Sequence, residues 1–271
     1  MPDILPFDRA DSDPMLLNIG CGRHFDDRWQ NLDIESSEPG VIVHDVTRGI
    51  PFETGSFDAV YHSHLLEHLK PHLGRALMAD CLRVLKPGGV LRIVVPDLER
   101  IAELYLQKHH CAWNGDDDAA IDYNWMKLEL LDQLVRECSG GRMGSYMASP
   151  EIKNSDFVRS RVGDEFKICR GTETYSKAAP IRPGLGKRFS DFTRRWREKL
   201  SREFVRLMLG RNGAAAFDEG VFRSRGEIHR WMYDRYSLRE LCHSTGFRDF
   251  RVLSATDSGI ESYRQYRLDS V

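Results

Sequence analysis

Five short apolar segments, each bounded by turn residues, lie between Met15 and Asp97, and they restrict the fold more than any other feature of the sequence. Many of their residues are β-branched, as in strands that are buried on both faces of a parallel sheet. The segments are MLLNI (15–19), NLDI (31–34), VIVHDV (41–46), FDAVYHS (57–63) and VLRIVVPD (90–97). We therefore predict five successive strands.

A helical pattern separates the last two of these strands. In residues 65–89 the apolar positions recur at steps of three or four, and a Pro-Gly-Gly stop follows. The apolar positions are Leu73, Leu77, Cys81, Val84 and Leu85. A helix that joins two strands in this way makes them parallel, so the sequence predicts a doubly wound α/β sheet with ligands at the carboxyl ends of its strands.

The strand pattern disappears from residue 98 to residue 225, where several segments have helical periodicity and residues 149–183 are turn-rich and ambiguous. We interpret residues 98–225 as a mostly helical insertion and residues 1–97 and 226–271 as the core. Within the second core segment, residues 235–247 have the Ser, apolar face and Gly stop of a helix. Residues 247–255 and 262–270 could then form an edge hairpin.

Composition excludes several classes of protein. The chain has 41% hydrophobic and 30% charged residues, which is ordinary for a globular protein, and its net charge of −2 gives no overall attraction to nucleic acid. Six scattered cysteines form no Cys-x-x-Cys pair, so we expect reduced thiols. The acidic N-terminus is unlike a secretory signal, and no apolar run is long enough to span a bilayer. These features predict a cytoplasmic protein.

The residues Gly20-Cys21-Gly22 end the first predicted strand. Glycines lack β-carbons and so let the backbone approach a ligand closely, although a plain turn between two strands is the alternative. Ten residues separate Gly22 from Asp33, too few for a helix and its connecting loop, so we infer a shortened first crossover. A dinucleotide-binding fingerprint would need a third glycine where Phe25 stands, and a helix beginning there.

Taken in order, several segments resemble the class I S-adenosylmethionine-dependent methyltransferases, in particular a bacterial branch often found beside surface-polysaccharide genes. The segments are LNIGCG, NLDI, VIVHDVTRGIPFETGSFDAVYHSHLLEHL, RVLKPGGVLRIVVPD and HRWMYDRYSLRELCHSTGF. They cover the core and not the insertion. The sequence departs from the common pattern at Asn18, where many members have an acid, and at His24, where many have a third glycine.

The resemblance implies a Rossmann-like methyltransferase sheet that binds S-adenosylmethionine. Asp33 would accept both ribose hydroxyls, and Asp45 would lie near the adenine amino group with Val46. The implied cofactor-binding residues are Asn18, Gly20, Cys21, Gly22, Asp33, Asp45, Val46, His62 and Ser63.

Methyl transfer to a hydroxyl needs a base that takes its proton, and histidine suits this role because its ordinary pKa lies near neutrality. His64 is our first candidate and His229 the second, with Asp97 and Asp234 in reserve. His229 could equally serve packing alone. Trp231 and Tyr233 could be core residues or platforms for the apolar face of a sugar ring.

His64, Glu67 and His68 could share one helical face, an arrangement that would suit a metal site. Pro71 interrupts the series, and no further carboxylate or thiol at comparable spacing completes a set. The sequence therefore predicts no metal.

The favoured function is methylation of a hydroxyl on a saccharide or saccharide-linked intermediate, with the helical insertion forming the acceptor side. A small-molecule methyltransferase of secondary metabolism is one alternative. A non-catalytic protein that keeps the cofactor fold as a scaffold is another. The acceptor and the oligomeric state are not encoded in any motif of the sequence.

Residues 182–211 form a basic amphipathic segment. Ten Lys or Arg against three acids give it a charge of +7, which leaves −9 for the rest of the chain. Its apolar stripe consists of Phe189, Phe192, Trp196, Leu200, Phe204, Leu207 and Met208. Such a helix either packs its stripe on neighbouring helices, or lies on an anionic membrane and guides a phosphate-bearing, lipid-linked glycan.

Overall fold

The computed structural model describes residues 14–171, 185–254, 257–261, 263–266 and 268, and for residues 185–195 it describes the backbone alone. The chain divides into two compact units. One, the sheet unit, takes in the described residues of Met1–Leu66, His72–Val95 and Arg239–Ser270. The other, the helical unit, takes in those of Glu67–Pro71 and Pro96–Leu238. Residues 226–238, assigned to the core from sequence, thus cluster with the helical unit.

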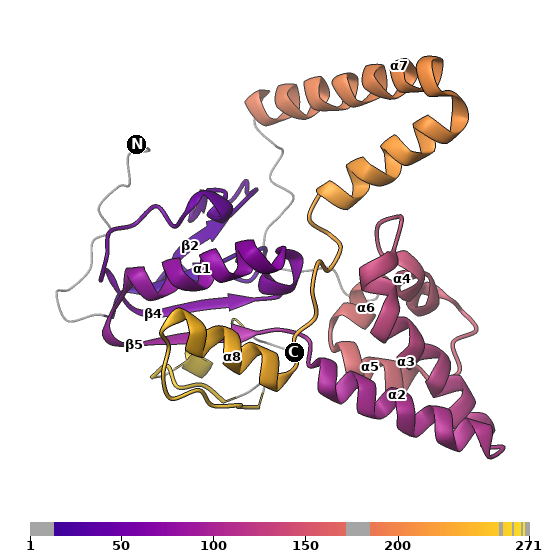
Figure 1. Cartoon of the computed structure of the whole chain (residues 1–271), viewed down its shortest axis with the longest axis horizontal. Helices are drawn as coiled ribbons and strands as arrows, with labels where there is room; N and C mark the ends of the chain where they lie inside the picture. The colour runs from indigo at the N-terminus through magenta and orange to yellow at the C-terminus, as the bar shows by residue number, and fades with distance from the viewer. Residues whose placement is uncertain (1–13, 172–184, 255–256, 262, 267, 269–271) are drawn as a thin grey trace. The chain divides into compact units, whose positions relative to one another are not determined.

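The sheet unit is built on five parallel strands in the order β3-β2-β1-β4-β5 (Figure 1). The strands are β1 (Leu16–Ile19), β2 (Gln30–Asp33), β3 (Val41–Val43), β4 (Phe57–Ser63) and β5 (Leu85–Val94). In the register of the sheet, Leu17 pairs with Gln30 of β2 and with Val60 of β4. This order is that of a doubly wound sheet, so the predicted fold class is confirmed.

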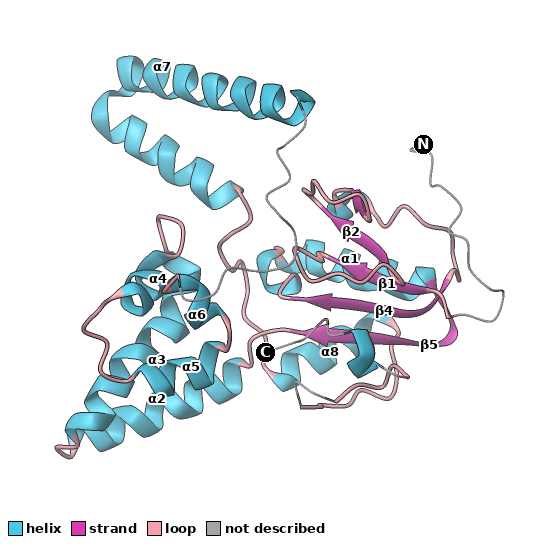
Figure 2. Cartoon of the chain, turned by 180° about the vertical axis from the view of Figure 1, so that it is seen from behind, coloured by secondary structure: helices cyan, strands magenta, loops and turns pink. Residues whose placement is uncertain are grey.

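Helix α1 (Pro71–Val84) is the predicted crossover between β4 and β5. It covers one face of the sheet: α1 lies in front of the strands in Figure 1, whereas β4 and β5 lie in front of it in Figure 2. Its buried residues include Leu77, Met78 and Cys81. The pairing of β4 with β5 passes from Phe57–Leu85 directly to Ala59–Val90, so the predicted Lys-Pro-Gly-Gly turn forms an irregularity at the start of β5.

The opposite face of the sheet is covered in an unusual way. Right-handed crossovers from β1 to β2 and from β2 to β3 would place helices on it, but residues 20–29 and 34–40 contain none. The C-terminal segment, with the 3-10 turn η3 (Tyr263–Tyr266), takes their place. The aliphatic and aromatic residues that pack there are Leu16, Trp29, Ala59, Tyr61, Ile260, Tyr263, Tyr266 and Leu268.

Two predictions for the C-terminal part have opposite outcomes. Helix α8 (Arg235–Thr245) forms where predicted and stops at Gly246. The predicted edge hairpin is wrong for the residues that the structure describes, since 247–254 contain no strand and 263–266 form η3. The physical reason is that Tyr263 and Tyr266 pack against Trp29 as single aromatic anchors, with ring centroids 6.4 and 5.3 Å from that of the indole.

The helical unit begins with two long helices, each capped by an aspartate. Asp97 accepts the N–H of Arg100 at the start of α2 (Leu98–Trp113), and Asp116 accepts that of Ala119 at the start of α3 (Asp117–Val135). Three shorter helices follow, α4 (Gly141–Ala148), α5 (Ser155–Val162) and α6 (Glu165–Cys169). The buried apolar residues of this bundle are Ile101, Leu104, Trp125, Met126, Met143, Met147, Val158 and Phe166.

Helix α7 (Leu185–Ser224) is non-helical at Gly210, where its two halves meet at a bend. An ion pair joins the halves, with Arg202 Nε 2.7 Å from Asp218 Oδ2. Arg225, which directly follows α7, lies with its Nη2 2.7 Å from Glu198 Oε2 in the first half. Figure 2 shows the two halves as separate arms. Across the described part of the chain, no helix combines the length and the apolar character that a membrane span needs.

Candidate functional site at the carboxyl ends of the strands

The glycine turn lies where β1 ends. Gly20 and Gly22 have φ of +66° and +53°, in the left-handed region where residues with a β-carbon are strained. A β-carbon on Gly20 would also lie 3.2 Å from the Leu65 side chain. A β-carbon on Gly22 would meet no atom within 4 Å, so the backbone at Gly22 faces open space. The turn therefore offers an accessible stretch of backbone to a ligand.

Asp33, at the end of β2, is tied directly to this turn. Its Oδ2 accepts the N–H of Gly22 at 2.8 Å, and its Oδ1 accepts that of Glu35 at 3.0 Å. Backbone hydrogen bonds also join the turn to β2, because the N–H groups of Gly20 and Cys21 both donate to the carbonyl of Leu32. The shortened crossover thus brings Asp33 beside the turn, a placement that the length of the loop alone did not predict. Each carboxylate oxygen keeps acceptor capacity for a ribose hydroxyl.

Asp45 lies just beyond β3 and begins the 3-10 turn η1 (Val46–Arg48). Its Oδ1 accepts hydrogen bonds from the N–H and the hydroxyl of Thr47, at 3.0 and 2.6 Å. The hydroxyl bond is the main reason why the pKa of Asp45 is lowered, so the side chain stays ionised at neutral pH. The carbonyl of Asp33 accepts the N–H of His44, which fixes the end of β3 beside that of β2.

Two buried amides, one of which sequence reasoning missed, hold the loop that replaces the first helix. Asn18 donates from Nδ2 to the carbonyl of His24 and to Oδ1 of Asn31. Asn31 donates from its own Nδ2 to the carbonyls of Asp26 and Trp29. Both asparagines are 1% exposed. Asn18 therefore satisfies a backbone carbonyl of the loop.

The end of β4 presents three predicted residues in different environments. His62 is fully buried, so its side chain lies away from any surface that a cofactor could reach in this conformation. Ser63 is partly exposed and His64 is exposed. His64 has φ of +49°, and its N–H donates to the carbonyl of Val94 at 3.0 Å. A left-handed histidine at a sheet edge is an uncommon conformation, of the kind that concentrates at functional sites.

Cys21 contributes backbone alone to this edge. Its side chain is 5% exposed, and burial, together with the charge of Asp33, raises the pKa of the thiol to about 12. Such a thiol is a poor nucleophile at neutral pH. The carboxyl ends of β1, β2, β3 and β4 thus combine open backbone, two carboxylates and an exposed imidazole, which suits a cationic cofactor with ribose and adenine parts.

The remaining catalytic candidates lie in the helical unit. His229 is 4% exposed, and its N–H donates to the carbonyl of Gln133. Asp97 caps α2 and forms an ion pair with Arg235 at 3.0 Å, and Asp234 accepts the N–H of Ser237 at 2.7 Å, which lowers the pKa of Asp234. Both reserve candidates therefore have structural partners.

The two aromatic candidates differ. Trp231 is 49% exposed, so its indole is accessible to a ligand, and Tyr233 is 5% exposed, so it is a core residue. The helical face considered for His64, Glu67 and His68 does not form, because His64 has a positive φ and the 3-10 turn η2 starts at Leu66 and ends at His68.

One hollow near the C-terminus lies apart from the predicted site. Its volume is about 460 Å³, and none of its lining residues is a predicted cofactor residue. These lining residues are Asp257, Ser258, Ile260, Tyr263, Arg264 and Gln265.

Comparison with protein families gives one match. The family model described as a methyltransferase domain matches residues 17–93, from β1 nearly to the end of β5, and leaves residues 96–238 of the helical unit outside the match. No curated protein matches the chain significantly. The matched segment contains the glycine turn, Asp33, Asp45 and the end of β4, and members of this family use S-adenosylmethionine as methyl donor. Residues 17–93 are therefore similar to a methyltransferase domain, and the protein is an S-adenosylmethionine-dependent methyltransferase.

Proposed function

We propose that this enzyme transfers the methyl group of S-adenosylmethionine to a hydroxyl of a saccharide or saccharide-linked intermediate. The observation that carries the site assignment is the bond from Gly22 N–H to Asp33, beside backbone that faces open space. In this proposal the turn Gly20-Cys21-Gly22 contacts the methionine part, Asp33 binds the ribose, and Asp45 with Val46 contacts the adenine.

Isothermal titration calorimetry with S-adenosylhomocysteine tests the proposed ribose contact. We expect Asp33→Ala to weaken binding by about 1 to 3 kcal/mol, because the ribose hydroxyls lose a charged acceptor. Glu35→Ala is the matched control, since Glu35 is an exposed acid two residues away. Equal affinity of the Asp33 variant and the wild type would remove Asp33 from the site.

We propose His64 as the base that takes the proton of the acceptor hydroxyl. Its exposure at the end of β4 supports this role, whereas the burial of His229 makes the second candidate less accessible. The variant His64→Asn separates chemistry from backbone, because asparagine also tolerates a positive φ but cannot act as a base. Turnover should fall by about 100-fold or more with cofactor affinity retained. Unchanged turnover would exclude His64 and direct attention to His229.

A row of rings in the helical unit, two of them exposed and two partly exposed, supports a saccharide acceptor. Tyr105, His109 and Trp113 follow one another along α2, with centroid distances of 6.3 and 6.4 Å and interplanar angles near parallel, 25° and 22°. Tyr123 of α3 lies 5.6 Å from His109, and Trp113 is 82% exposed. Accessible aromatic faces provide apolar contact area for sugar rings at low entropic cost.

Methylation assays with a panel of saccharides test the acceptor class. We expect Trp113→Ala to raise the KM for an accepted glycan and to leave the KM for S-adenosylmethionine unchanged. Leu106→Ala is the matched control, since Leu106 is another exposed residue of α2. A crystal soak with S-adenosylhomocysteine and candidate glycans would then identify the methylated hydroxyl.

Two alternatives give different results in the same assays. A methyltransferase of secondary metabolism would methylate small aromatic or aliphatic hydroxyls and ignore glycans. A non-catalytic scaffold would bind S-adenosylhomocysteine and turn over none of the substrates in either panel.

We also propose that the protein acts in the cytoplasm and contacts the inner face of the membrane through residues 182–211. Phe189 and Phe192 lie outside the residues whose side chains the structure describes. The other five residues of the stripe are exposed. The exposed fractions are 54% for Trp196, 59% for Leu200, 64% for Phe204, 82% for Leu207 and 65% for Met208.

The positive charge of α7 favours an anionic membrane surface as the partner of this stripe. Arg202, Arg206 and Arg211 line a hollow of about 340 Å³ beside the bend of α7, with Asp218 as its one acid. A basic amphipathic helix binds anionic lipid through apolar burial and electrostatic attraction together. Liposome co-sedimentation should therefore show binding to anionic vesicles, weakened by salt and by the triple reversal Arg197→Glu, Lys199→Glu and Arg206→Glu. Wild-type protein that stays in the supernatant with anionic vesicles at low salt would exclude membrane contact.

A further inference from the structure

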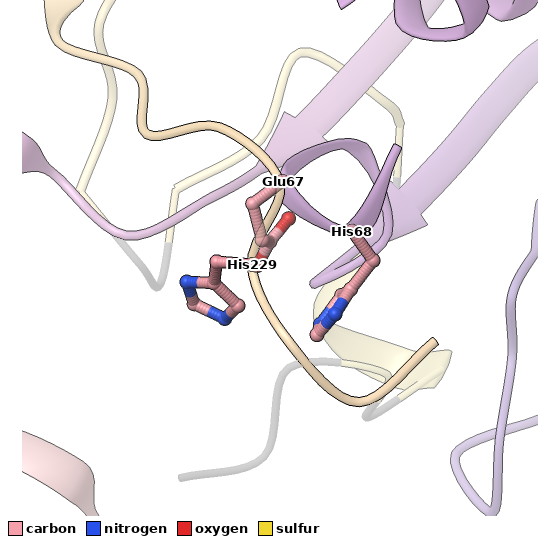
Figure 3. A group of neighbouring side chains, drawn as sticks. All are labelled: Glu67, His68 and His229. Atoms are coloured by element: carbon pink, nitrogen blue, oxygen red, sulfur yellow. The ribbon is translucent and has the colours of Figure 1, made fainter. Parts of the chain in front are cut away.

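Three potential metal ligands converge in the helical unit. Glu67 and His68 belong to the turn η2, and His229 comes from a segment 161 residues farther along the chain. One ligand atom from each of the three side chains lies within 4.8 Å of the other two. Figure 3 shows the carboxylate of Glu67 between the two imidazole rings, whose centroids are 4.8 Å apart at an angle of 88°.

Backbone hydrogen bonds fix this arrangement independently of the side chains. The carbonyl of Glu67 accepts the N–H of Arg230 at 2.7 Å and that of Trp231 at 3.1 Å. The N–H of His229 donates to the carbonyl of Gln133 in α3 at 3.0 Å. The two ligand-bearing segments are therefore held together before any ion binds, which lowers the entropic cost of forming a site.

Both imidazoles have an acceptor beside the same ring nitrogen. Nδ1 of His68 lies 3.2 Å from the carbonyl oxygen of Ile228, and Nδ1 of His229 lies 3.5 Å from the sulfur of Met232. A carbonyl and a thioether can only accept, so Nδ1 carries the hydrogen in each ring. Metal-bound histidines commonly donate from their other ring nitrogen to a carbonyl in the same way.

Burial makes a cation the natural complement of this cluster. Glu67 is fully buried and His229 is 4% exposed. An ionised carboxylate removed from water is costly unless positive charge compensates it.

We propose that Glu67, His68 and His229 bind one divalent transition metal ion, with Zn²⁺ the best match to two imidazoles and one carboxylate. Such a ligand set leaves a fourth position for water or a substrate oxygen. Bonds of about 2.0 to 2.2 Å place tetrahedral ligand atoms about 3.3 Å apart, so the side chains would move together by about 1.5 Å at most. The proposal does not depend on the identity of the methyl acceptor.

Metal titration of untagged, chelator-treated protein tests the site. A Cys138→Ser, Cys169→Ser background removes the two exposed thiols, which could bind metal themselves. We expect one Zn²⁺ per chain by calorimetry, and one Co²⁺ with the visible spectrum of nitrogen and oxygen ligation. Affinity should fall by about 100-fold or more in Glu67→Gln and in His229→Gln, because loss of a ligand costs at least as much as loss of its supporting hydrogen bond.

The matched control is His110→Ala, which removes an exposed histidine of the same unit and should leave the affinity unchanged. Circular dichroism checks that each variant folds. If a variant does not fold, NMR of the wild-type imidazoles decides instead, since Zn²⁺ should shift the resonances of His68 and His229 and leave those of His110 unaffected. Absence of stoichiometric binding by the wild type, binding that survives both ligand substitutions, or Zn²⁺ shifts that miss His68 and His229 would each overturn the proposal.

Discussion

The sheet unit and the helical unit distribute charge in opposite ways. At the ends of β2 and β3, Asp33 and Asp45 are partly exposed and accept backbone N–H groups. In the helical unit, Glu129 and Asp132 are 7% and 3% exposed, while large apolar side chains of α7 lie in solvent. The topology of the sheet puts the carboxyl ends of its strands at one edge, where their polar groups are exposed. In the helices, packing decides which groups are buried.

The buried acids of the helical unit are supported by specific partners. Glu129 accepts Trp125 Nε1–H at 2.9 Å and an N–H of Arg161 at 2.6 Å. Asp132 accepts the N–H of Arg142 at 2.9 Å and lies 3.3 Å from a guanidinium nitrogen of Arg136. These contacts replace the water that the acids lose on folding.

The largest expected effect comes from the aromatic anchor of the sheet unit. Trp29 is 1% exposed and packs edge-on against Tyr61, Tyr263 and Tyr266. Trp29→Ala should reduce the free energy of unfolding by about 3 to 5 kcal/mol, because it leaves a cavity on the face of the sheet that no crossover helix covers. Trp113→Ala, at an exposed tryptophan of the helical unit, should change it by no more than about 0.5 kcal/mol. Urea unfolding measures both, and similar losses would contradict the assigned burial.

A second test concerns the buried charge of the helical unit. Arg161→Met should destabilise the protein by about 2 to 4 kcal/mol, because Glu129 keeps its charge and loses its partner. Adding Glu129→Gln, which retains an oxygen for Trp125 Nε1, should restore at least half of the loss. A double variant as unstable as the single one would show that the charge of Glu129 is not the cause.

The third prediction uses pH to examine the glycine turn. The folded state raises the pKa of Cys21 to about 12, from an ordinary value of about 8.5, so it holds the thiol proton more tightly than the unfolded state does. The resulting stability is complete below about pH 8.5 and is lost as the pH rises toward 12, by about 1 to 2 kcal/mol between pH 7 and pH 10. Cys21→Ala should unfold with a smaller loss over this range.

Thiol labelling gives a kinetic check of the same prediction. At pH 9 iodoacetamide should modify the exposed Cys138 rapidly and the buried Cys21 and Cys81 slowly. Labelling of Cys21 at the rate of Cys138 would mean that the turn opens readily.

The smallest effect on stability is expected in α7. Leu200→Ser and Leu207→Ser replace residues that are 59% and 82% exposed, so the free energy of unfolding should change by no more than about 0.5 kcal/mol. Binding to anionic vesicles should nevertheless weaken, which would separate a surface role from a packing role. A large loss of stability with unchanged vesicle binding would instead mean that the stripe packs on protein.

The sequence by itself determined the elements whose signals are local. Runs such as FDAVYHS specify strands through their continuous apolar, β-branched character, and the periodic residues of 71–84 specify a helix through their spacing. The ten residues after Gly22 excluded a first helix. The two glycines were predictable for the same reason, since a sharp turn after a buried strand needs left-handed backbone.

Tertiary structure alone decided the contacts between segments far apart in the sequence. It buried His62, placed Asn31 under the shortened loop, and covered the bare face of the sheet with Tyr263 and Tyr266 in place of the predicted hairpin. It also brought His229 to Glu67 and His68, a set that no spacing within one segment could predict. The physical reason is that burial and ligand geometry depend on the summed packing of the whole unit, whereas spacing records only the local conformation of the chain.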